Sequence, residues 1–311
     1  MVLDKPICFM VNIVSVNKIT VIKKFEYTPI LGWSTSRYDM FLLCRRQYYY
    51  NYYGKHDPLY SRQKIDELKK LTSIPLEIGN VTHDVIKVFL DRLLKSEGKI
   101  DTGRFFDYVR RKTEEYCHAK RFMEVYYDEI SNIDIDELFA KIQNSLSNFL
   151  NSDRCNWLTT KVISNKQSWL IEPSGYGETR IDEMKAYCKV DFLFPCDDDI
   201  YIIDWKTGKR DEKKHKKQLL GYVSWAAYHF EKDPVKIIPI IAYLQPSYEE
   251  MKMNFNEYDI QDFAIHIKEE TEEMYSVCSN IEENIPEDKE RFTKTTNTKI
   301  CNYCNYRELC R

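Results

Sequence analysis

Two aspartates and a lysine in the second half of the sequence could hold a divalent metal ion against a phosphate. Asp191 and Asp204 lie in the segments 186–194 (AYCKVDFLF) and 200–206 (IYIIDWK), which are short and rich in β-branched and aromatic residues. The acidic turn between them predicts an antiparallel hairpin that places the carboxylates on adjacent strands. Carboxylate oxygens suit Mg²⁺ or Mn²⁺, and Lys206 faces the same side as Asp204. This trio therefore predicts metal-assisted phosphate chemistry.

A surface Asp–Lys pair at a strand end is the alternative explanation for Asp204 and Lys206. The apolar residues that precede Asp204 weaken it, because they indicate a buried strand in which an unpaired carboxylate is costly. His83, near the start of a predicted helix, is by itself more typical of a capping or core histidine. It becomes a third metal ligand if the fold brings it to the carboxylates. Gln218 and Tyr222, four residues apart, are by themselves ordinary polar residues of one helix face.

Three cysteines near the end of the chain have the spacing of a metal site. Cys301, Cys304 and Cys310 form the pattern C-x2-C-x5-C. A closed site needs four ligands, and Cys44 is the best candidate for the fourth. The spacing leaves zinc and an iron–sulfur cluster open, with three incidental thiols as the remaining alternative. The chain has ten cysteines and no recognisable export signal, so we expect reduced thiols in a cytoplasmic protein.

Charge is concentrated locally rather than over the whole chain. With 46 Lys and Arg against 49 Asp and Glu, the formal net charge is −3, so any surface for nucleic acid must be local. Seven basic residues between positions 206 and 217 are either a solvated face or a site for a phosphate backbone. Arg45 and Arg46 beside Tyr48, Tyr49 and Tyr50 suit single-stranded nucleic acid, although core packing explains the tyrosines equally well. No run of 18 apolar residues occurs, which argues against a membrane span.

The elements that position these residues follow from hydrophobic periodicity. Residues 1–30 predict an irregular or strand-like lead, and Ser34 is a plausible N-cap for a helix over 34–53. The hairpin is followed by a predicted strand over 236–244, which Pro239 weakens or confines to a sheet edge. Apolar repeats predict further helices, over about 80–95, 105–127, 138–150, 216–230 and 260–281. The order of these elements predicts an α/β or α+β fold.

Taken in order along the chain, these residues resemble a known family. Cys44, His83, Asp191, Asp204-x-Lys206, Gln218-x3-Tyr222 and the cysteine tail are similar to the RecB-like branch of the PD-(D/E)XK nucleases, in its iron–sulfur subgroup. That subgroup includes CRISPR-associated RecB-family exonucleases and the nuclease domain of AddB. The strings IIDWKTGK and CNYCNYRELC carry the resemblance most specifically. Asp204 stands where many members have Glu, which shortens the reach to a metal without changing the chemistry.

The resemblance implies a site and an activity. His83, Asp191, Asp204 and the backbone carbonyl of Trp205 would hold Mg²⁺ or Mn²⁺, and Lys206 would position the attacking water. Gln218 and Tyr222 would match the QxxxY motif that lines the site and contacts DNA. A [4Fe–4S] cluster would link Cys44 to the tail as a structural tie, through the ligands Cys44, Cys301, Cys304 and Cys310.

The implied protein is a metal-dependent deoxyribonuclease, exonuclease rather than endonuclease, acting on single-stranded DNA or DNA ends. Repair, phage and defence or CRISPR roles all remain open, as does a helicase or CRISPR-adaptation partner. The alternative is a non-catalytic, metal-linked module that binds nucleic acid or protein. We expect an α/β, restriction-endonuclease-like core, a small mixed sheet flanked by helices. The expected parts are a lead (1–33), a helical part with Cys44 and His83 (34–99), a helical insertion (100–165), the nuclease core (166–290) and the cysteine-rich tail (291–311).

Overall fold

A five-stranded mixed sheet organises the molecule. The computed structural model describes residues 23–95, 101–173 and 177–310, so most of the predicted lead over 1–30 lies outside the described residues. The strand order is β1-β4-β5-β6-β7, and only β5 and β6 run parallel. Helix α9, which joins these two strands, provides the crossover that a parallel pair needs. The strands are β1 (Leu170–Ile171), β4 (Phe192–Cys196), β5 (Asp199–Lys206), β6 (Ile237–Tyr243) and β7 (Glu249–Lys252).

The predicted hairpin is confirmed, with one change at its start. Strands β4 and β5 pair antiparallel, with Phe192 opposite Ile203 and Cys196 opposite Asp199. The expected single strand over 186–194 is in fact divided. Its first residues end β3 (Met184–Tyr187), which pairs with β2 (Glu178–Ile181) in a separate two-stranded sheet. Asp191 lies just before β4, and the register brings it opposite Asp204 at the open end of the hairpin.

The edge position suggested by Pro239 is wrong, because β6 lies between β5 and β7. Pro239 is opposite Ile202 in the parallel pair. On its other side, however, β7 pairs only with residues from Ile240 to Tyr243. The first half of β6 therefore has an unpaired side, where a missing N–H is tolerated.

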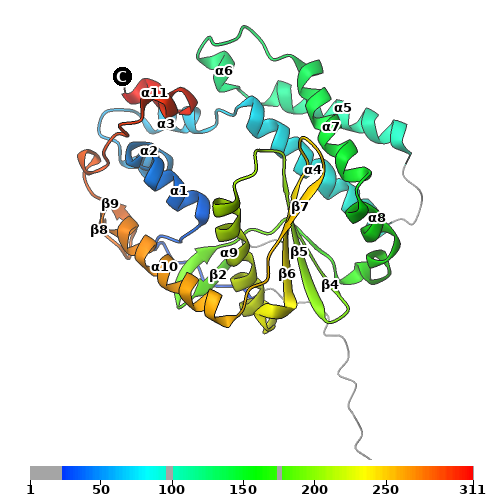
Figure 1. Cartoon of the computed structure of the whole chain (residues 1–311). Coiled ribbons are helices and arrows are strands. Elements are labelled where there is room, and N and C mark those ends of the chain that lie inside the picture. Colours follow the sequence, from blue (N-terminus) through cyan, green and yellow to red (C-terminus); the bar gives the residue numbers. More distant parts are fainter. Residues whose placement is uncertain (1–22, 96–100, 174–176, 311) are drawn as a thin grey trace, which may run out of the picture.

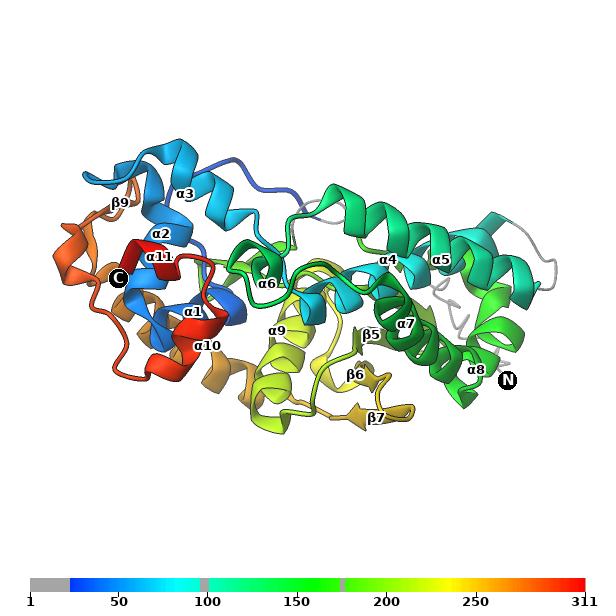
Figure 2. The same cartoon turned by 90° about the horizontal axis from the view of Figure 1, so that it is seen from above.

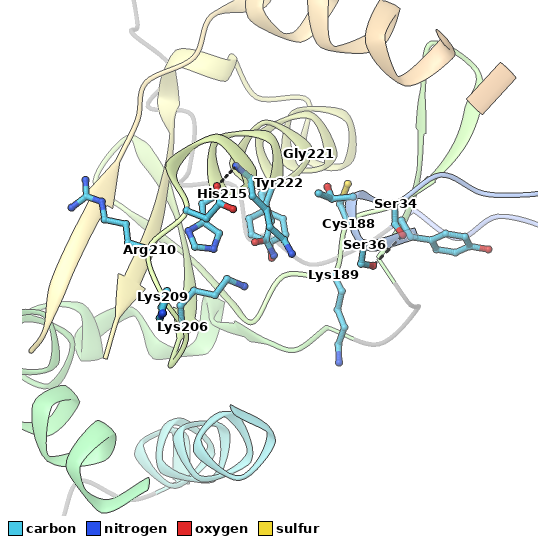
Figure 3. A pocket seen from close by; sticks show the side chains of 15 residues that line it. Ser34, Ser36, Cys188, Lys189, Lys206, Lys209, Arg210, His215, Gly221 and Tyr222 are labelled. Carbon is cyan, nitrogen blue, oxygen red and sulfur yellow. Dashed lines mark hydrogen bonds between the residues drawn. The ribbon is translucent and has the colours of Figure 1, made fainter. Parts of the chain in front are cut away.

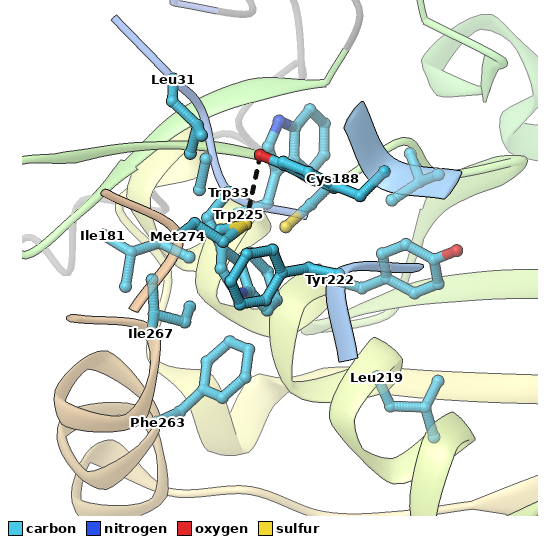
Figure 4. Close-up of a cluster of buried hydrophobic side chains, with 14 of the residues drawn as sticks. Leu31, Trp33, Ile181, Cys188, Leu219, Tyr222, Trp225, Phe263, Ile267 and Met274 are labelled. Carbon is cyan, nitrogen blue, oxygen red and sulfur yellow. Dashed lines mark hydrogen bonds between the residues drawn. The ribbon is translucent and has the colours of Figure 1, made fainter. Parts of the chain in front are cut away.

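Side chains of β5 alternate between two cores. Ile202 belongs to the core beneath α9 (Glu212–Phe230) and α10 (Glu257–Tyr275), whereas Ile203 belongs to the core beneath α4 (Ile74–Lys95) and α7 (Ile135–Leu150). Successive strand residues point to opposite faces, so each face needs its own helical cover. Figure 1 shows α4 and α9 near the sheet, and Figure 4 shows the first core, including Leu219, Trp225, Phe263 and Ile267.

Two predicted long helices are shorter than expected. The segment 105–127 forms α5 (Thr102–Ala119) and α6 (Met123–Tyr126), because the chain between them pairs with Thr72 through the Arg121 and Met123 backbone. The segment 260–281 ends as a helix at Tyr275, and the hairpin β8 (Cys278–Asn280) and β9 (Ile285–Pro286) follows. Helix α8 covers Asp153–Thr160. Short 3-10 turns lie at η1 (Gly54–His56), η2 (Val162–Ser168), η3 (Pro234–Lys236), η4 (Lys289–Arg291) and η5 (Thr298–Tyr303).

The predicted helix over 34–53 is divided at Cys44. Ser34 is the N-cap, accepting a hydrogen bond from the Arg37 N–H at 3.2 Å, as predicted. Cys44 has an extended backbone (φ −163°, ψ 108°), which separates α1 (Thr35–Leu43) from α2 (Arg45–Tyr53). Helix α3 covers Arg62–Lys69 and α11 covers Arg307–Cys310. Figures 1 and 2 both place α11 beside these N-terminal helices.

The tyrosines of α2 are core residues and provide no stacking surface for nucleic acid. Tyr48, Tyr49 and Tyr50 are at most 1% exposed. Phe292 packs on Tyr48 and Tyr49, and Arg46 donates a hydrogen bond from Nε to the Phe292 carbonyl. The suggestion of a single-strand surface here is therefore wrong. Among the described residues, no helix is long and apolar enough to cross a membrane.

Candidate active site

Asp204 is the most deeply buried carboxylate at the end of β5. It shares the face of Ile202, so it points toward α9, and it is 2% exposed. Gln218 Nε2 donates to Asp204 Oδ1 at 3.2 Å, and the Tyr222 hydroxyl donates to the same oxygen. Gln218 and Tyr222 lie one helical turn apart on α9, so their spacing places both on this carboxylate.

The second oxygen of Asp204 faces a lysine. Lys206 Nζ lies 2.6 Å from Asp204 Oδ2, which is buried and has no well-aligned hydrogen bond. Burial raises the pKa of Asp204; Lys206 opposes this effect, and the neighbouring Asp191 adds to it. A buried carboxylate oxygen that is held by an ion pair without a well-aligned hydrogen bond is an atom that a metal ion can coordinate if it shares or displaces the lysine contact.

Asp191 connects the end of β5 to α4 through two contacts. Its Oδ2 accepts a hydrogen bond from the Trp205 N–H at 3.1 Å and lies 3.2 Å from His83 Nδ1. Burial works against ionisation, but His83 and then Lys206 lower the pKa of Asp191 overall. The side chain of Trp205 points to the opposite core, where it packs on Phe149. Only its backbone therefore borders the site.

His83 reaches the carboxylates from the other face of the sheet. It lies in the middle of α4, rather than in the first turn as predicted, because α4 begins at Ile74. Burial by itself would lower the pKa of His83, but Asp191 and Asp204 outweigh it and raise the value to about 9. The imidazole is thus a cation beside two carboxylates, and a metal that binds through its nitrogen must displace the proton.

The structure brings His83, Asp191, Asp204, Lys206, Gln218 and Tyr222 to one place, through the contacts given above. Across the described ranges, however, no set of three or more His, Cys, Asp or Glu side chains is arranged to hold a metal ion as it stands. The ion pair of Asp204 with Lys206 and that of Asp191 with His83 occupy the carboxylate oxygens. The roles of these residues as metal ligands therefore stay predictions.

A cavity of about 840 Å³ opens beside these residues. Lys206, Gln218 and Tyr222 line it, and Figure 3 shows Lys206, His215 and Tyr222 together on one wall. His215 was missed in the sequence. It lies three residues before Gln218, a spacing that places both near one helix face, and this could have identified it. Its Nδ1 lies 2.6 Å from the Tyr243 hydroxyl, and burial, followed by Lys206, lowers the pKa of His215 to about 4.

The four predicted cluster cysteines line a second cavity, of about 230 Å³. Residues of the tail meet the break between α1 and α2 there, so Cys44 lies near positions far along the chain. All four are free thiols, and burial raises the pKa of Cys304 to about 12 and also raises that of Cys310. The extended backbone at Cys44 ends α1 and starts α2 at the cavity wall. The cavity is lined by Cys44, Cys301, Cys304 and Cys310.

Comparison with known proteins gives a family. A model described as the PD-(D/E)XK nuclease superfamily matches residues 32–311. A search of curated proteins finds no match. Among solved structures, one titled "Crystal structure of SSO0001" is 17% identical in sequence, and the match covers 60% of this chain and 77% of that chain. The TM-score of 0.29 is too low to define a shared fold. The mixed sheet flanked by helices fits a restriction-endonuclease-like core, and nucleases of this superfamily generally use Mg²⁺ or Mn²⁺. Because the match spans nearly the whole sequence, the chain belongs to the PD-(D/E)XK nuclease superfamily.

Proposed function

We propose that the chain is a Mg²⁺- or Mn²⁺-dependent deoxyribonuclease of the RecB-like branch that cuts single-stranded DNA or DNA ends. The observation that carries this proposal is the meeting of His83, Asp191, Asp204 and Lys206 at the end of β5. Superfamily membership gives the reaction class, a metal-dependent hydrolysis of nucleic acid. Exonuclease action and a role in repair, phage biology or defence, with a helicase or CRISPR-adaptation partner, belong to the same proposal.

The donor set fits a hard divalent ion. His83, Asp191, Asp204 and the Trp205 carbonyl would hold it, and the buried Oδ2 of Asp204, which has an ion pair but no well-aligned hydrogen bond, supports this assignment. When bound, the metal supplies Lewis acidity and lowers the pKa of its water. Gln218 and Tyr222 fix the Asp204 carboxylate by donating to its Oδ1. Lys206 holds a positive charge 2.6 Å from Asp204 Oδ2, where it can orient water and oppose the negative charge that develops on phosphorus.

Cleavage of labelled single-stranded DNA tests the assignment. We expect Mn²⁺-dependent products that disappear in Asp204→Ala and in Lys206→Ala. Asp198→Ala is the matched control, because Asp198 is an exposed carboxylate of the same hairpin that pairs with Lys232 and Lys236. Activity that survives both site substitutions removes the proposed site. DNA binding without metal-dependent turnover would favour the non-catalytic module instead.

The same proposal assigns the four cysteines to a [4Fe–4S] cluster. Four thiols that line one cavity of about 230 Å³ support a four-ligand metal group, and zinc is the competing occupant. The group would tie the α1–α2 break to the C-terminal segment. Protein prepared without oxygen should be brown and contain iron rather than zinc. Cys44→Ser should lose the iron, whereas Cys117→Ser, a thiol outside the cavity, should keep it. Zinc in the purified protein would contradict the cluster without affecting the nuclease proposal.

A further inference from the structure

The cavity beside the catalytic residues is strongly cationic in a chain whose net charge is −3. Among the described residues that line it, one is acidic, Asp211. The cationic members come from two separate parts of the chain, the loop after β3 and the stretch from the end of β5 into α9. They are Lys189, Lys206, Lys209, Arg210 and Lys214. A concentration of one sign of charge in a concave site attracts a ligand of the opposite sign.

The structure divides the basic run of residues 206–217 into two groups. Lys214 lies one helical turn before Gln218, so the face of α9 that holds Asp204 continues into the cationic wall. Lys213 and Lys216 are exposed and do not line the cavity. Lys217 forms an ion pair with Glu270, in which Nζ lies 2.6 Å from Oε1. Helical spacing, and not the length of the run, thus decides which cations reach the cavity.

Three of the lining cations, Lys189, Lys209 and Lys214, have weak or no ion pairs with other described residues, whereas Lys206 pairs with Asp204 and Arg210 with Glu212. Lys189 is 66% exposed, and its nearest carboxylate, Glu172, is 4.0 Å away. Lys214 is 53% exposed and lies 3.4 Å from Asp39. Lys209 has no ion pair with any described residue. Exposed pairs of this kind contribute little to stability, so these ammonium groups can turn to a phosphate at low cost.

The size of the cavity indicates the class of ligand. Its volume of about 840 Å³ lies in the range of roughly 300–1,000 Å³ that encloses a single drug-sized molecule. That space suits a few nucleotides of one strand. The hydroxyl-bearing residues Ser34, Thr35 and Ser36 form part of the lining, and Figure 3 shows Ser34, Ser36 and Lys189 on the side away from Arg210. Hydroxyls and ammonium groups are common partners of the phosphate backbone.

We propose that this cavity is the track for a single DNA strand, in which Lys189, Lys209 and Lys214 bind the phosphates next to the bond that is cut. The inference rests on the proposed nuclease function, because it takes the adjacent carboxylates to be the cleavage site. Lys206, Gln218 and Tyr222 line the track and contact Asp204, so a strand held there passes the catalytic residues.

Binding of a fluorescent single-stranded oligothymidylate, measured by anisotropy over a range of salt concentrations, tests the track. An Asp204→Asn background prevents cleavage. Two double variants of equal charge are compared, Lys209→Gln/Lys214→Gln in the track and Lys213→Gln/Lys216→Gln outside it. For single strands each phosphate contact contributes about 0.7 to the slope of log K against log salt. Losing two contacts should lower the slope by about 1.4 and weaken binding about 25-fold at 0.1 M salt. The single substitution Lys189→Gln should lower the slope of log K against log salt by about 0.7.

The control double variant should change affinity and slope far less than the track variant. Equal losses in the two double variants, or parental binding by the track variant, overturn the proposal. A blunt duplex of the same oligothymidylate annealed to oligodeoxyadenylate should bind more weakly and respond less to the track substitutions; an equal response overturns the single-strand assignment. Absence of metal-dependent cleavage by the unsubstituted protein would instead overturn the proposed function, so the two failures are distinguishable.

Discussion

A buried ion pair that fastens α8 to the edge of the sheet gives a quantitative test of the fold. Arg154 Nε donates to Glu250 Oε1 and Arg154 Nη2 donates to Glu250 Oε2, both at 2.8 Å, in a bidentate contact between α8 and β7. The side chains are 9% and 15% exposed. Tyr248 donates to Glu250 Oε1 at 2.7 Å, and Lys252 Nζ lies 3.0 Å from Oε2. Glu250→Gln removes the charge and leaves Arg154 without its partner.

The magnitude follows from the ionisation of Glu250. Burial opposes the charged form, but the hydrogen bonds from Arg154 and Tyr248 outweigh it and lower the pKa of Glu250 from 4.5 to about 2. At ~1.4 kcal/mol for each tenfold change in ionisation constant, this corresponds to about 3 kcal/mol of unfolding free energy. Solvent screening at a site that is not fully enclosed reduces the expectation to about 2–3 kcal/mol.

The sign of the pH dependence is fixed by the lowered pKa. The stabilisation is fully present above pH ~4.5, where the unfolded chain is also ionised, and is lost as the pH falls from there toward ~2. Urea unfolding from pH 7 to pH 3.5 should show Glu250→Gln about 2–3 kcal/mol less stable at pH 7. That deficit should shrink by about 1 kcal/mol at pH 3.5.

The adjacent glutamate provides the control. Glu249 is 57% exposed and lies 3.6 Å from Arg210, so Glu249→Gln should stay within about 0.5 kcal/mol of the unsubstituted protein. A Glu250→Gln deficit that is equally large at pH 7 and pH 3.5 would refute the electrostatic reasoning. It would show that packing, and not the ionised carboxylate, accounts for the loss.

Three further outcomes are expected. Lys289→Met should lower the unfolding free energy by about 3–5 kcal/mol in urea, because its ion pair with Asp57 at 2.6 Å is almost fully buried. Gly177→Ala should lower the unfolding free energy by about 2 kcal/mol or more, because φ is +61° and an added Cβ would lie 2.3 Å from the Cys188 carbonyl oxygen. Gly208→Ala, where an added Cβ meets open space, should leave the unfolding free energy nearly unchanged. Mn²⁺ should raise the unfolding temperature of the unsubstituted protein, and EDTA should reverse it, with no such change in Asp204→Asn; an equal rise in that variant would argue against Asp204 as a ligand.

Local sequence signals predicted the parts of the site that depend on short-range geometry. The hairpin follows from two β-rich segments around an acidic turn, and it brings Asp191 opposite Asp204. The four-residue spacing of Gln218 and Tyr222 places both donors on one oxygen of Asp204. In each case the geometry is set by fewer than about fifteen residues of chain, where periodicity is informative.

Features that depend on distant contacts were not predictable in this way. The break at Cys44 lies within a sequence that favours helix, and tertiary packing decides it, since the Arg46 N–H donates to the Thr293 carbonyl far along the chain. Pro239 suggested an edge strand, but β6 is internal. The side of β6 at Pro239 is unpaired because β7 reaches only to Ile240, and the sequence of β6 does not indicate how far its neighbour extends. The pairing of Arg154 with Glu250 joins residues nearly a hundred positions apart, and no local pattern signals it.

The location of the site follows from where a sheet allows its two faces to meet. Along the middle of β5, side chains such as Ile202 and Ile203 are separated by the sheet itself and enter different cores. Only at the strand end can His83, from α4 on one face, pair with Asp191 beside Asp204, which Gln218 of α9 holds from the other face. The site therefore depends on how α4 seats against the sheet as well as on its ligands. Substitutions that loosen α4 should consequently reduce activity even when His83, Asp191 and Asp204 are all unchanged, because a displacement of about 1 Å is enough to impair catalysis.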